Sequence, residues 1–130
     1  MARRHKPHYQ LECWRIAFDF VAVAYQFGRS FPTEERFELA PPLRRAATSV
    51  PLNIAEGAGR DSPAEFCRFL VIAHGSITEL DTIILLAERL GYLTTPQTDE
   101  AVATLDRITT LINGLLKKLR TQPQSPLPSP

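Results

Sequence analysis

The sequence predicts an all-α protein, folded as an antiparallel, up-down four-helix bundle. Three observations lead to this fold class. Apolar residues recur at spacings of three and four along four long segments, which is the period of an α-helix. No segment shows the strict alternation of apolar and polar residues that is typical of a half-buried strand. The connections between the four segments are short, so consecutive helices are expected to run antiparallel.

The first long segment, residues 10–29, carries more apolar surface than the core of one bundle requires. One apolar series along this predicted helix comprises Leu11, Trp14, Phe18, Val21 and Tyr25. A second series lies on another side and comprises Cys13, Ala17, Phe20, Ala24 and Phe27. A helix that only covers its own core needs an apolar arc of roughly 100°. The helix could therefore lie at the centre of the domain or pack against another subunit. Because a four-helix bundle has no central helix, we predict that the second series forms an interface between subunits.

Prolines and a short polar motif indicate where the first helix ends and the second begins. Phe31-Pro32 ends the first helix, and Thr33 is expected to cap a short extra helical turn between the first and second helices. The second long helix is expected to begin near Ala40, because the two prolines that follow suit a first turn, where N–H groups have no helical partner. Pro51 lies inside this helix and predicts a bend, since it removes one backbone hydrogen bond.

The third and fourth helices have the clearest boundaries. Ser62, with Glu65 three residues later, predicts a capping box, and Gly91 predicts a left-handed ending for the third helix. The seam of this helix repeats every seven residues and comprises Phe66, Ala73, Leu80 and Ala87 together with Leu70, Ile77 and Ile84. The fourth helix is expected to run from Thr95 to about Arg120. Its seam comprises Ala101, Leu105, Ile108, Ile112, Leu115 and Leu119.

Residues 43–60 predict an amphipathic helix with a polar stripe along one face. The stripe comprises Arg45, Ser49, Asn53, Glu56 and Arg60, with Arg44 beside it. A different face carries a packing seam of Ala47, Val50, Ile54 and Gly57. We favour a structural interpretation of the stripe, in which Glu56 pairs with Arg60 and the network fixes helix packing or the subunit contact. The functional alternative is an anion-binding or nucleic-acid-contacting face, in which arginine side chains grip phosphate. A catalytic role for Glu56 is the least favoured, because no base or nucleophile is near it in sequence.

Composition and charge describe an ordinary globular domain. The chain of 130 residues is 44% hydrophobic and 22% charged. Three of its 15 basic residues lie in the first eight positions, which leaves 12 against 14 acidic residues in the rest of the chain. A dedicated nucleic-acid binder usually has a basic body, so the charge does not favour that class. We expect residues 1–9 to be a disordered basic arm, 10–120 the bundle domain and 121–130 a disordered Pro-rich tail.

Targeting signals and sites of chemistry are not evident in the sequence. We find no apolar leader and no uncharged stretch long enough to span a bilayer, so we expect a cytoplasmic protein without a membrane partner. The Glu-x-x-His pairs of a di-iron bundle are missing, and His74 is expected to be a packed histidine. Cys13 and Cys67 lack the spacing of metal ligands and are expected to be buried thiols. We therefore expect no catalytic residues, no metal and no cofactor.

A set of motifs carries a family resemblance over residues 10–120. The first group is Arg44-Arg45-Ala46, Ser49-Val50-Pro51, Asn53-Ile54-Ala55-Glu56-Gly57 and Gly59-Arg60. Downstream motifs include Glu65-Phe66, Arg68-Phe69-Leu70, Gly75-Ser76 and Leu90-Gly91-Tyr92. With these motifs the chain resembles the bacterial four-helix-bundle proteins that are encoded within intervening sequences of 23S ribosomal RNA genes. That family is similar in fold to the accessory protein of diversity-generating retroelements, which binds nucleic acid and its reverse transcriptase through basic outer surfaces. The resemblance implies a four-helix bundle that associates in rings of five, and it implies no enzymatic activity.

The expected function follows from these points. We expect a non-enzymatic homo-oligomer, a pentameric ring, with a structural or adaptor role towards a partner that the sequence does not identify. The alternative is a nucleic-acid or ribonucleoprotein accessory protein that binds RNA or DNA.

Overall fold

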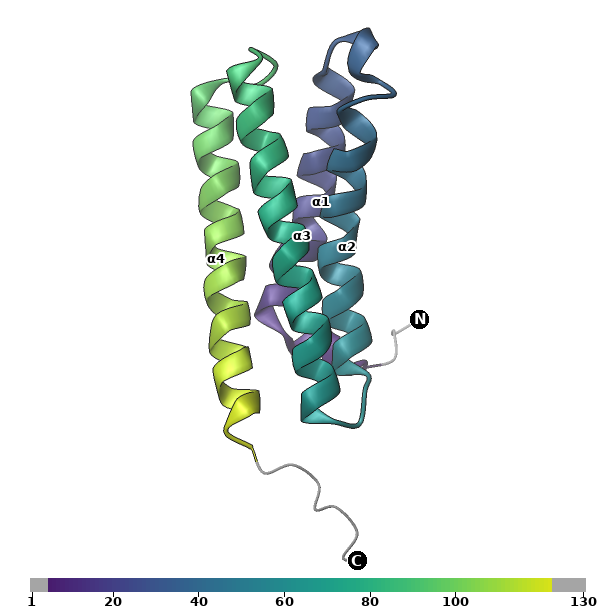
Figure 1. Cartoon of the computed structure of the whole chain (residues 1–130), viewed down its shortest axis with the longest axis vertical. Helices are drawn as coiled ribbons and strands as arrows, with labels where there is room; N and C mark the ends of the chain where they lie inside the picture. Colours follow the sequence, from purple (N-terminus) through teal and green to yellow (C-terminus); the bar gives the residue numbers. More distant parts are fainter. Residues whose placement is uncertain (1–4, 123–130) are drawn as a thin grey trace, which may run out of the picture.

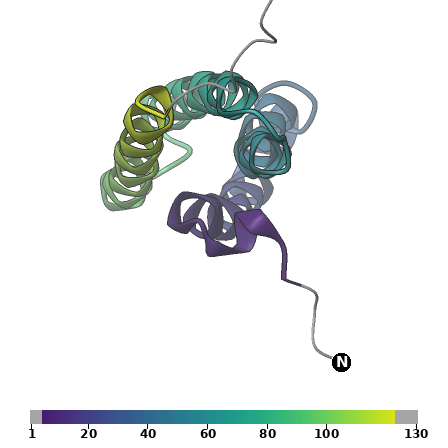
Figure 2. The same ribbon diagram turned by 90° about the horizontal axis from the view of Figure 1, so that it is seen from below.

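The computed structural model describes residues 5–122 and confirms the antiparallel four-helix bundle (Figure 1). Its long helices are α1 (Glu12–Ser30), α2 (Ala40–Ala58), α3 (Pro63–Arg89) and α4 (Thr95–Arg120). Seen from below, the four helices follow one another along an arc in chain order (Figure 2). Each helix packs on the next, and α1 also contacts α4. Short connections therefore place neighbours in sequence side by side in space.

Side-chain caps begin α3 and α4. The Ser62 hydroxyl accepts a hydrogen bond from the Glu65 N–H at 3.2 Å. The Glu65 carboxylate accepts from Arg68 at 2.7 Å and makes no recorded return bond, so only half of the predicted capping box forms. The complete box lies at α4, where the Thr94 hydroxyl accepts from the Gln97 N–H at 3.2 Å and the Gln97 side chain accepts from the Thr94 N–H at 2.9 Å.

The turn between α3 and α4 ends α3 in the predicted left-handed conformation. Gly91 has φ +84°, a backbone conformation that residues other than glycine rarely adopt. The Tyr92 N–H donates to the Ala87 carbonyl at 2.8 Å and the Gly91 N–H donates to the Glu88 carbonyl at 2.9 Å. The Tyr92 hydroxyl also donates to Glu35 at 2.8 Å, which ties this turn to the segment that follows α1.

Two short 3-10 helices complete the described chain. Thr33–Glu35 (η2) is the predicted extra turn, but Pro32 occupies the capping position, and no side-chain cap forms there. Pro7–Gln10 (η1) packs on α1 and α2, so regular structure begins before the predicted boundary at residue 10. Residues 1–4 of the predicted arm and 123–130 of the predicted tail lie outside the described part of the chain.

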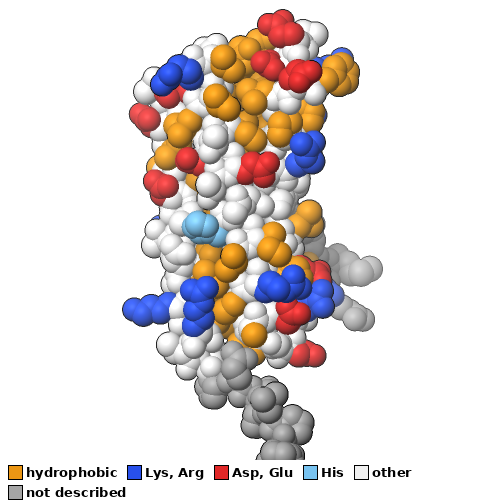
Figure 3. All heavy atoms as spheres, in the orientation of Figure 1, with side chains coloured by type: hydrophobic (Ala, Val, Ile, Leu, Met, Phe, Trp, Pro, Cys, Tyr) orange, Lys and Arg blue, Asp and Glu red, His pale blue; other side chains and the backbone are white. Residues whose placement is uncertain are grey.

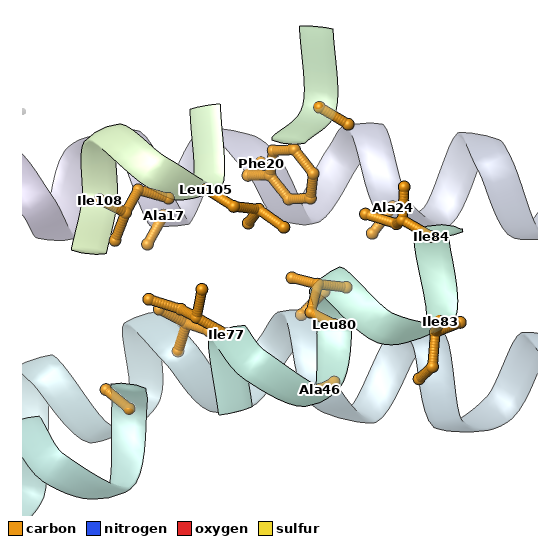
Figure 4. Close-up of a cluster of buried hydrophobic side chains, with 14 of the residues drawn as sticks. Ala17, Phe20, Ala24, Ala46, Ile77, Leu80, Ile83, Ile84, Leu105 and Ile108 are labelled. Carbon is orange, nitrogen blue, oxygen red and sulfur yellow. The ribbon is translucent and has the colours of Figure 1, made fainter. Parts of the chain in front are cut away.

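The predicted subunit interface on α1 is wrong, because its residues are already covered within one subunit. The side chains concerned are Cys13 (4% exposed), Ala17 (2%), Phe20 (4%), Ala24 (0%) and Phe27 (8%). Figure 4 shows Ala17, Phe20 and Ala24 directed toward residues of α3 and α4. The small side chains in this series let the neighbouring helices approach closely. The bulkier aromatic series of α1 is the one that faces outward.

The residues of the other predicted seams are buried, except at single positions. On α2, Ala47, Val50 and Ile54 are buried as predicted, and the helix continues past a buried Pro51. On α4, Leu116 is buried in place of Leu115, which is only half-buried. An α-helix has 3.6 residues per turn, so the buried position near the end of this long helix falls one residue later than the predicted seam.

Helix α3 is apolar on more than its core side. By length and composition alone it could cross a membrane, with mean hydropathy 1.6 over its most apolar window. A third of that window (33%) is buried in the bundle, and core helices of bundles meet the same criterion. The rest of the apolar character lies on the outer face of the helix, at residues such as Leu85 and Leu86.

We predict that Gly57→Ala destabilises the protein by about 1–3 kcal/mol, because the added methyl group would overpack the contact between α2 and α3. A Cβ atom at Gly57 would lie 2.8 Å from the Phe69 Cβ, 2.9 Å from the Phe66 Cδ1 and 3.2 Å from the Phe66 carbonyl oxygen. Urea unfolding measures the change. Gly114→Ala on α4 is the matched control, because no atom lies within 4 Å of its Cβ, and we expect it to stabilise by roughly 0.5–1 kcal/mol. Equal effects at both glycines would contradict the close α2–α3 contact.

We predict that Cys13 resists alkylation in the folded protein while Cys67 reacts. Burial raises the pKa of the Cys13 thiol from 9.0 to about 11, so it is protonated near pH 8, and it is also inaccessible, whereas Cys67 is half-buried. Because the unfolded thiol ionises near 9.0, this group's contribution to stability falls as pH rises from 9.0 to about 11. Mass spectrometry after iodoacetamide treatment should find Cys13 modified only under unfolding conditions. Rapid modification of Cys13 in a folded Cys67→Ser variant would refute the burial.

Candidate functional site

The centre of the polar stripe on α2 is a hydrogen-bonded contact with α3. The Ser49 and Ser76 hydroxyl groups lie 2.7 Å apart and share a hydrogen bond. The Asn53 amide donates to the Ser49 carbonyl at 2.8 Å and to its hydroxyl at 2.9 Å. We call Ser49, Asn53 and Ser76 the serine–asparagine cluster. It contains no base or acid that could activate a hydroxyl, so its geometry suits helix packing rather than nucleophilic chemistry.

The lower end of the stripe is an exposed ion pair beside an aromatic ring. Arg60 pairs with Glu56 as predicted, and the two side chains are 45% and 52% exposed. The Arg60 guanidinium lies 5.1 Å from the centre of the Phe69 ring, and Arg68 lies 4.4 Å from the same ring. Arg68 also holds the pKa of the Glu65 carboxyl below its usual value through a hydrogen bond. Exposed pairs of this kind contribute little energy, and Glu56 lacks the buried setting of a catalytic carboxylate.

The upper end of the stripe divides between two environments. Arg45 is exposed and has no carboxylate within 4.0 Å among the described residues. Arg44 is half-buried, and its guanidinium carbon lies 5.9 Å from the centre of the Tyr25 ring on α1. Five of the six predicted stripe residues lie on α2, Arg60 follows its end, and the six do not form one site. They are divided between a helix contact, a surface ion pair, a separate cavity and, for Arg45, the exposed surface.

The cavity beside Arg44 lies where α1 ends and α2 begins. It has a volume of about 450 Å³, and three arginines line it, Arg29, Arg36 and Arg44. Its remaining lining residues are Gly28, Phe31, Pro32, Thr33 and Ala40. We call it the arginine cavity. Sequence analysis missed Arg29 and Arg36, because they lie outside the α2 stripe and reach Arg44 only through the chain reversal at residues 31–39.

An apolar groove lies between α1 and α2. It has a volume of about 540 Å³, and its lining residues are Trp14, Phe18, Val21, Ala22, Tyr25, Thr48, Pro51 and Leu52. We call it the aromatic groove. The Trp14 and Phe18 rings stack at 4.9 Å, and His8 and Tyr9 of η1 pack against Trp14. Four of the five residues of the aromatic series on α1 therefore form one wall of this groove.

No metal or catalytic centre is evident within residues 5–122, where no three His, Cys, Asp or Glu side chains are grouped to hold an ion. His74 is half-buried on α3, and Cys13 is a buried thiol of the core. The hydrogen bond from Tyr92 to Glu35 raises the pKa of the tyrosine, because ionisation would lose the bond. This bond ties two connecting segments together and has a structural role.

We predict that the serine–asparagine cluster couples α2 to α3 energetically. Ser49→Ala and Ser76→Ala should each lower the free energy of unfolding by about 1 kcal/mol, and the double variant should lose less than the sum, because both changes remove the same bond. Thr82→Ala is the control, since its exposed hydroxyl bonds only to the Thr78 carbonyl of its own helix, at 2.9 Å. Strict additivity in denaturant unfolding would show that the two serines act independently.

Comparison with known proteins places the chain in a family. No curated protein matches it. A crystal structure of a protein of unknown function from the S23 ribosomal protein family of Bacteroides thetaiotaomicron has the same fold, with a TM-score of 0.75. The two chains are 23% identical, and the match covers 81% of this chain and 98% of the other, so it shows the fold alone. The model of the family described as 23S rRNA-intervening sequence protein matches residues 9–114, most of the chain, and this protein therefore belongs to that family.

Proposed function

We propose that this protein is a non-enzymatic scaffold that assembles with copies of itself into a closed ring. The aromatic groove carries this proposal, because it leaves large apolar side chains in water. Phe18 is 56% exposed and Leu52 is 66% exposed, although both lie on ordered helices. Contiguous exposed apolar surface on a folded domain is typical of an interaction site. The groove takes the place of the α1 interface that the sequence predicted on the opposite, buried series.

A second exposed apolar surface lies on the outer face of α3. Its residues are Val71 (51% exposed), Ile72 (41%), Leu85 (46%), Leu86 (46%) and Leu90 (52%). Figure 3 shows hydrophobic side chains on the face of the molecule on which α3 lies in front, gathered mainly toward its two ends with other side chains between them. On a helical wheel these five positions fall within less than half of the circumference, away from the core side. The chain therefore has two distinct apolar surfaces, one concave between α1 and α2 and one convex on α3.

Two different surfaces favour a head-to-tail contact over a two-fold dimer. A contact between the groove of one copy and the α3 face of the next is heterologous, so it repeats around a ring and closes when the rotation permits. The family resemblance implies five subunits. Such a ring would remove both apolar surfaces from water, at about 25 cal/mol for each Å² of apolar surface covered.

An adaptor role fits the chemistry of the described surface better than catalysis does. Ser49 and Glu56 are the stripe residues that could best act as a nucleophile or a base. Ser49 is hydrogen-bonded to Asn53 and Ser76, and Glu56 is paired with Arg60. The ring would present the outer faces of several identical bundles to a partner, and repeated copies of one weak contact bind with higher avidity than a single copy.

We predict that the wild-type protein has a mass near five times 14.6 kDa in solution, measured by light scattering coupled to size exclusion. Phe18→Asp combined with Leu52→Asp should shift it to a helical species of about 14.6 kDa, because the charges would be buried in the contact. Circular dichroism checks that the double variant is folded.

The control for this experiment is Phe37→Asp. Phe37 is 81% exposed but lies outside both apolar surfaces, so its replacement should leave the mass unchanged. A wild-type monomer at low and high concentration would refute the proposed assembly. Dissociation by Phe37→Asp as complete as that of the groove variant would refute the role of the groove.

A further inference from the structure

The arginine cavity concentrates positive charge at one end of the bundle. Arg29 comes from the last turn of α1, Arg36 from the segment after η2 and Arg44 from the first turns of α2. No aspartate or glutamate lines the cavity. Within residues 5–122 the recorded ion pairs are Arg60–Glu56, Arg68–Glu65 and Arg107–Glu12, so none of the three cavity arginines has a carboxylate within 4.0 Å.

The surroundings of Arg44 hold its guanidinium in a defined place. Its Nη1 lies beside Gly28, at 3.5 Å from the position that a Cβ atom would take there, which is an ordinary contact distance. The Tyr25 ring lies on another side, 5.9 Å from the guanidinium carbon. No hydrogen bond from the Arg44 side chain to another described residue is recorded, although its backbone carbonyl accepts one from Thr48. The Arg44 guanidinium is therefore partly held by its neighbours, and its N–H groups remain available to bind a ligand.

The acidic residues closest in sequence to Arg36 do not line the cavity. Glu34, Glu35 and Glu38 belong to the same connecting segment as Arg36, but none of them lines the cavity. Glu35 accepts the hydrogen bond from Tyr92. Arg29 also lies in the last turn of α1, where the negative end of the helix dipole offsets part of its charge.

We propose that the arginine cavity binds a phosphate ester. Guanidinium groups form paired, charge-assisted hydrogen bonds with phosphate oxygens. Three arginines line this cavity, and none of its lining residues is a carboxylate. The N-terminal amides of α2 contribute little, because Pro41 and Pro42 have no N–H and the Leu43 N–H bonds to the Leu39 carbonyl. Binding therefore depends on the arginine side chains themselves.

The size of the cavity favours an esterified phosphate over a bare ion. Its volume of about 450 Å³ lies in the range of roughly 300–1,000 Å³ that is typical of small-molecule sites. Phe31 and Pro32 add an apolar wall against which the esterified group can pack. The phosphate can belong to a polynucleotide backbone or to a small phosphorylated molecule. This site is separate from the apolar surfaces proposed for assembly, and one subunit supplies all of its lining residues.

The test compares phosphate probes on the full-length protein in a low-salt buffer free of phosphate and sulfate. Calorimetry measures ribose 5-phosphate and inorganic phosphate, and fluorescence anisotropy measures a short single-stranded RNA without terminal phosphates. Arg36→Gln combined with Arg44→Gln should weaken binding by at least about tenfold, because two charge-assisted contacts are lost. Arg44→Lys keeps the charge without the fork and should bind with intermediate affinity.

Arg45→Gln is the control for the change at Arg44, because it removes one positive charge at the next residue and lies outside the cavity. It should leave the affinity for every probe within about twofold of the wild type if the cavity is the site. Thermal unfolding confirms that each variant is folded. Binding of the RNA with cavity dependence identifies a polynucleotide as the source of the phosphate, whereas binding of ribose 5-phosphate alone identifies a small ester.

Three outcomes would overturn the proposal. One is that no probe binds at millimolar concentration in low salt. Another is that Arg45→Gln weakens binding as much as the double cavity variant, which would point to diffuse surface charge. The third is that the folded double variant retains wild-type affinity.

Discussion

The close approach of α2 to α3 is the constraint on which the rest of the structure depends. Gly57 has no side chain, and the space that one would fill holds Phe66 and Phe69. Further along the same contact, the Ser49 and Ser76 hydroxyl groups meet at 2.7 Å. One contact is steric and the other polar, so together they set both the spacing and the register of the two helices. With α2 held in this way, its other sides are directed toward the aromatic groove and the arginine cavity.

The aromatic groove follows from the composition of α1. The side that faces the core carries Ala17 and Ala24 together with Phe20 and Phe27. The side that faces outward carries Trp14, Phe18 and Tyr25. Close packing in the interior favours the side that carries the alanines, because helices can approach one another only where side chains are short. The outward Trp14 and Phe18 rings stack on one another at the surface, and their contact with water favours association.

Most of the fold could be predicted from the sequence, because helices leave periodic and terminal signals. The ending at Gly91 and the short connections depend on local chemistry that the residues themselves display. The period of the two apolar series of α1 is the same, so it could not show which series faces the core and which faces outward. That orientation depends on which neighbours surround the helix, and the only sequence signal was side-chain size. The six stripe residues were separated for a similar reason, since one helix face contacts α3 at Ser49 but reaches water at Glu56.

The arginine cavity could not be predicted because its members belong to three separate segments. Their meeting depends on the chain reversal between α1 and α2, and no periodic signal describes it. Tyr25 links this cavity to the groove, since it lines the groove and its ring faces Arg44. A neighbouring copy seated in the groove would exclude water from that ring and lower the local dielectric around the guanidinium. Hydrogen bonds between a guanidinium and a phosphate strengthen as water is excluded. Assembly through the groove would therefore favour anion binding in the cavity, and by linkage an anion in the cavity would favour assembly.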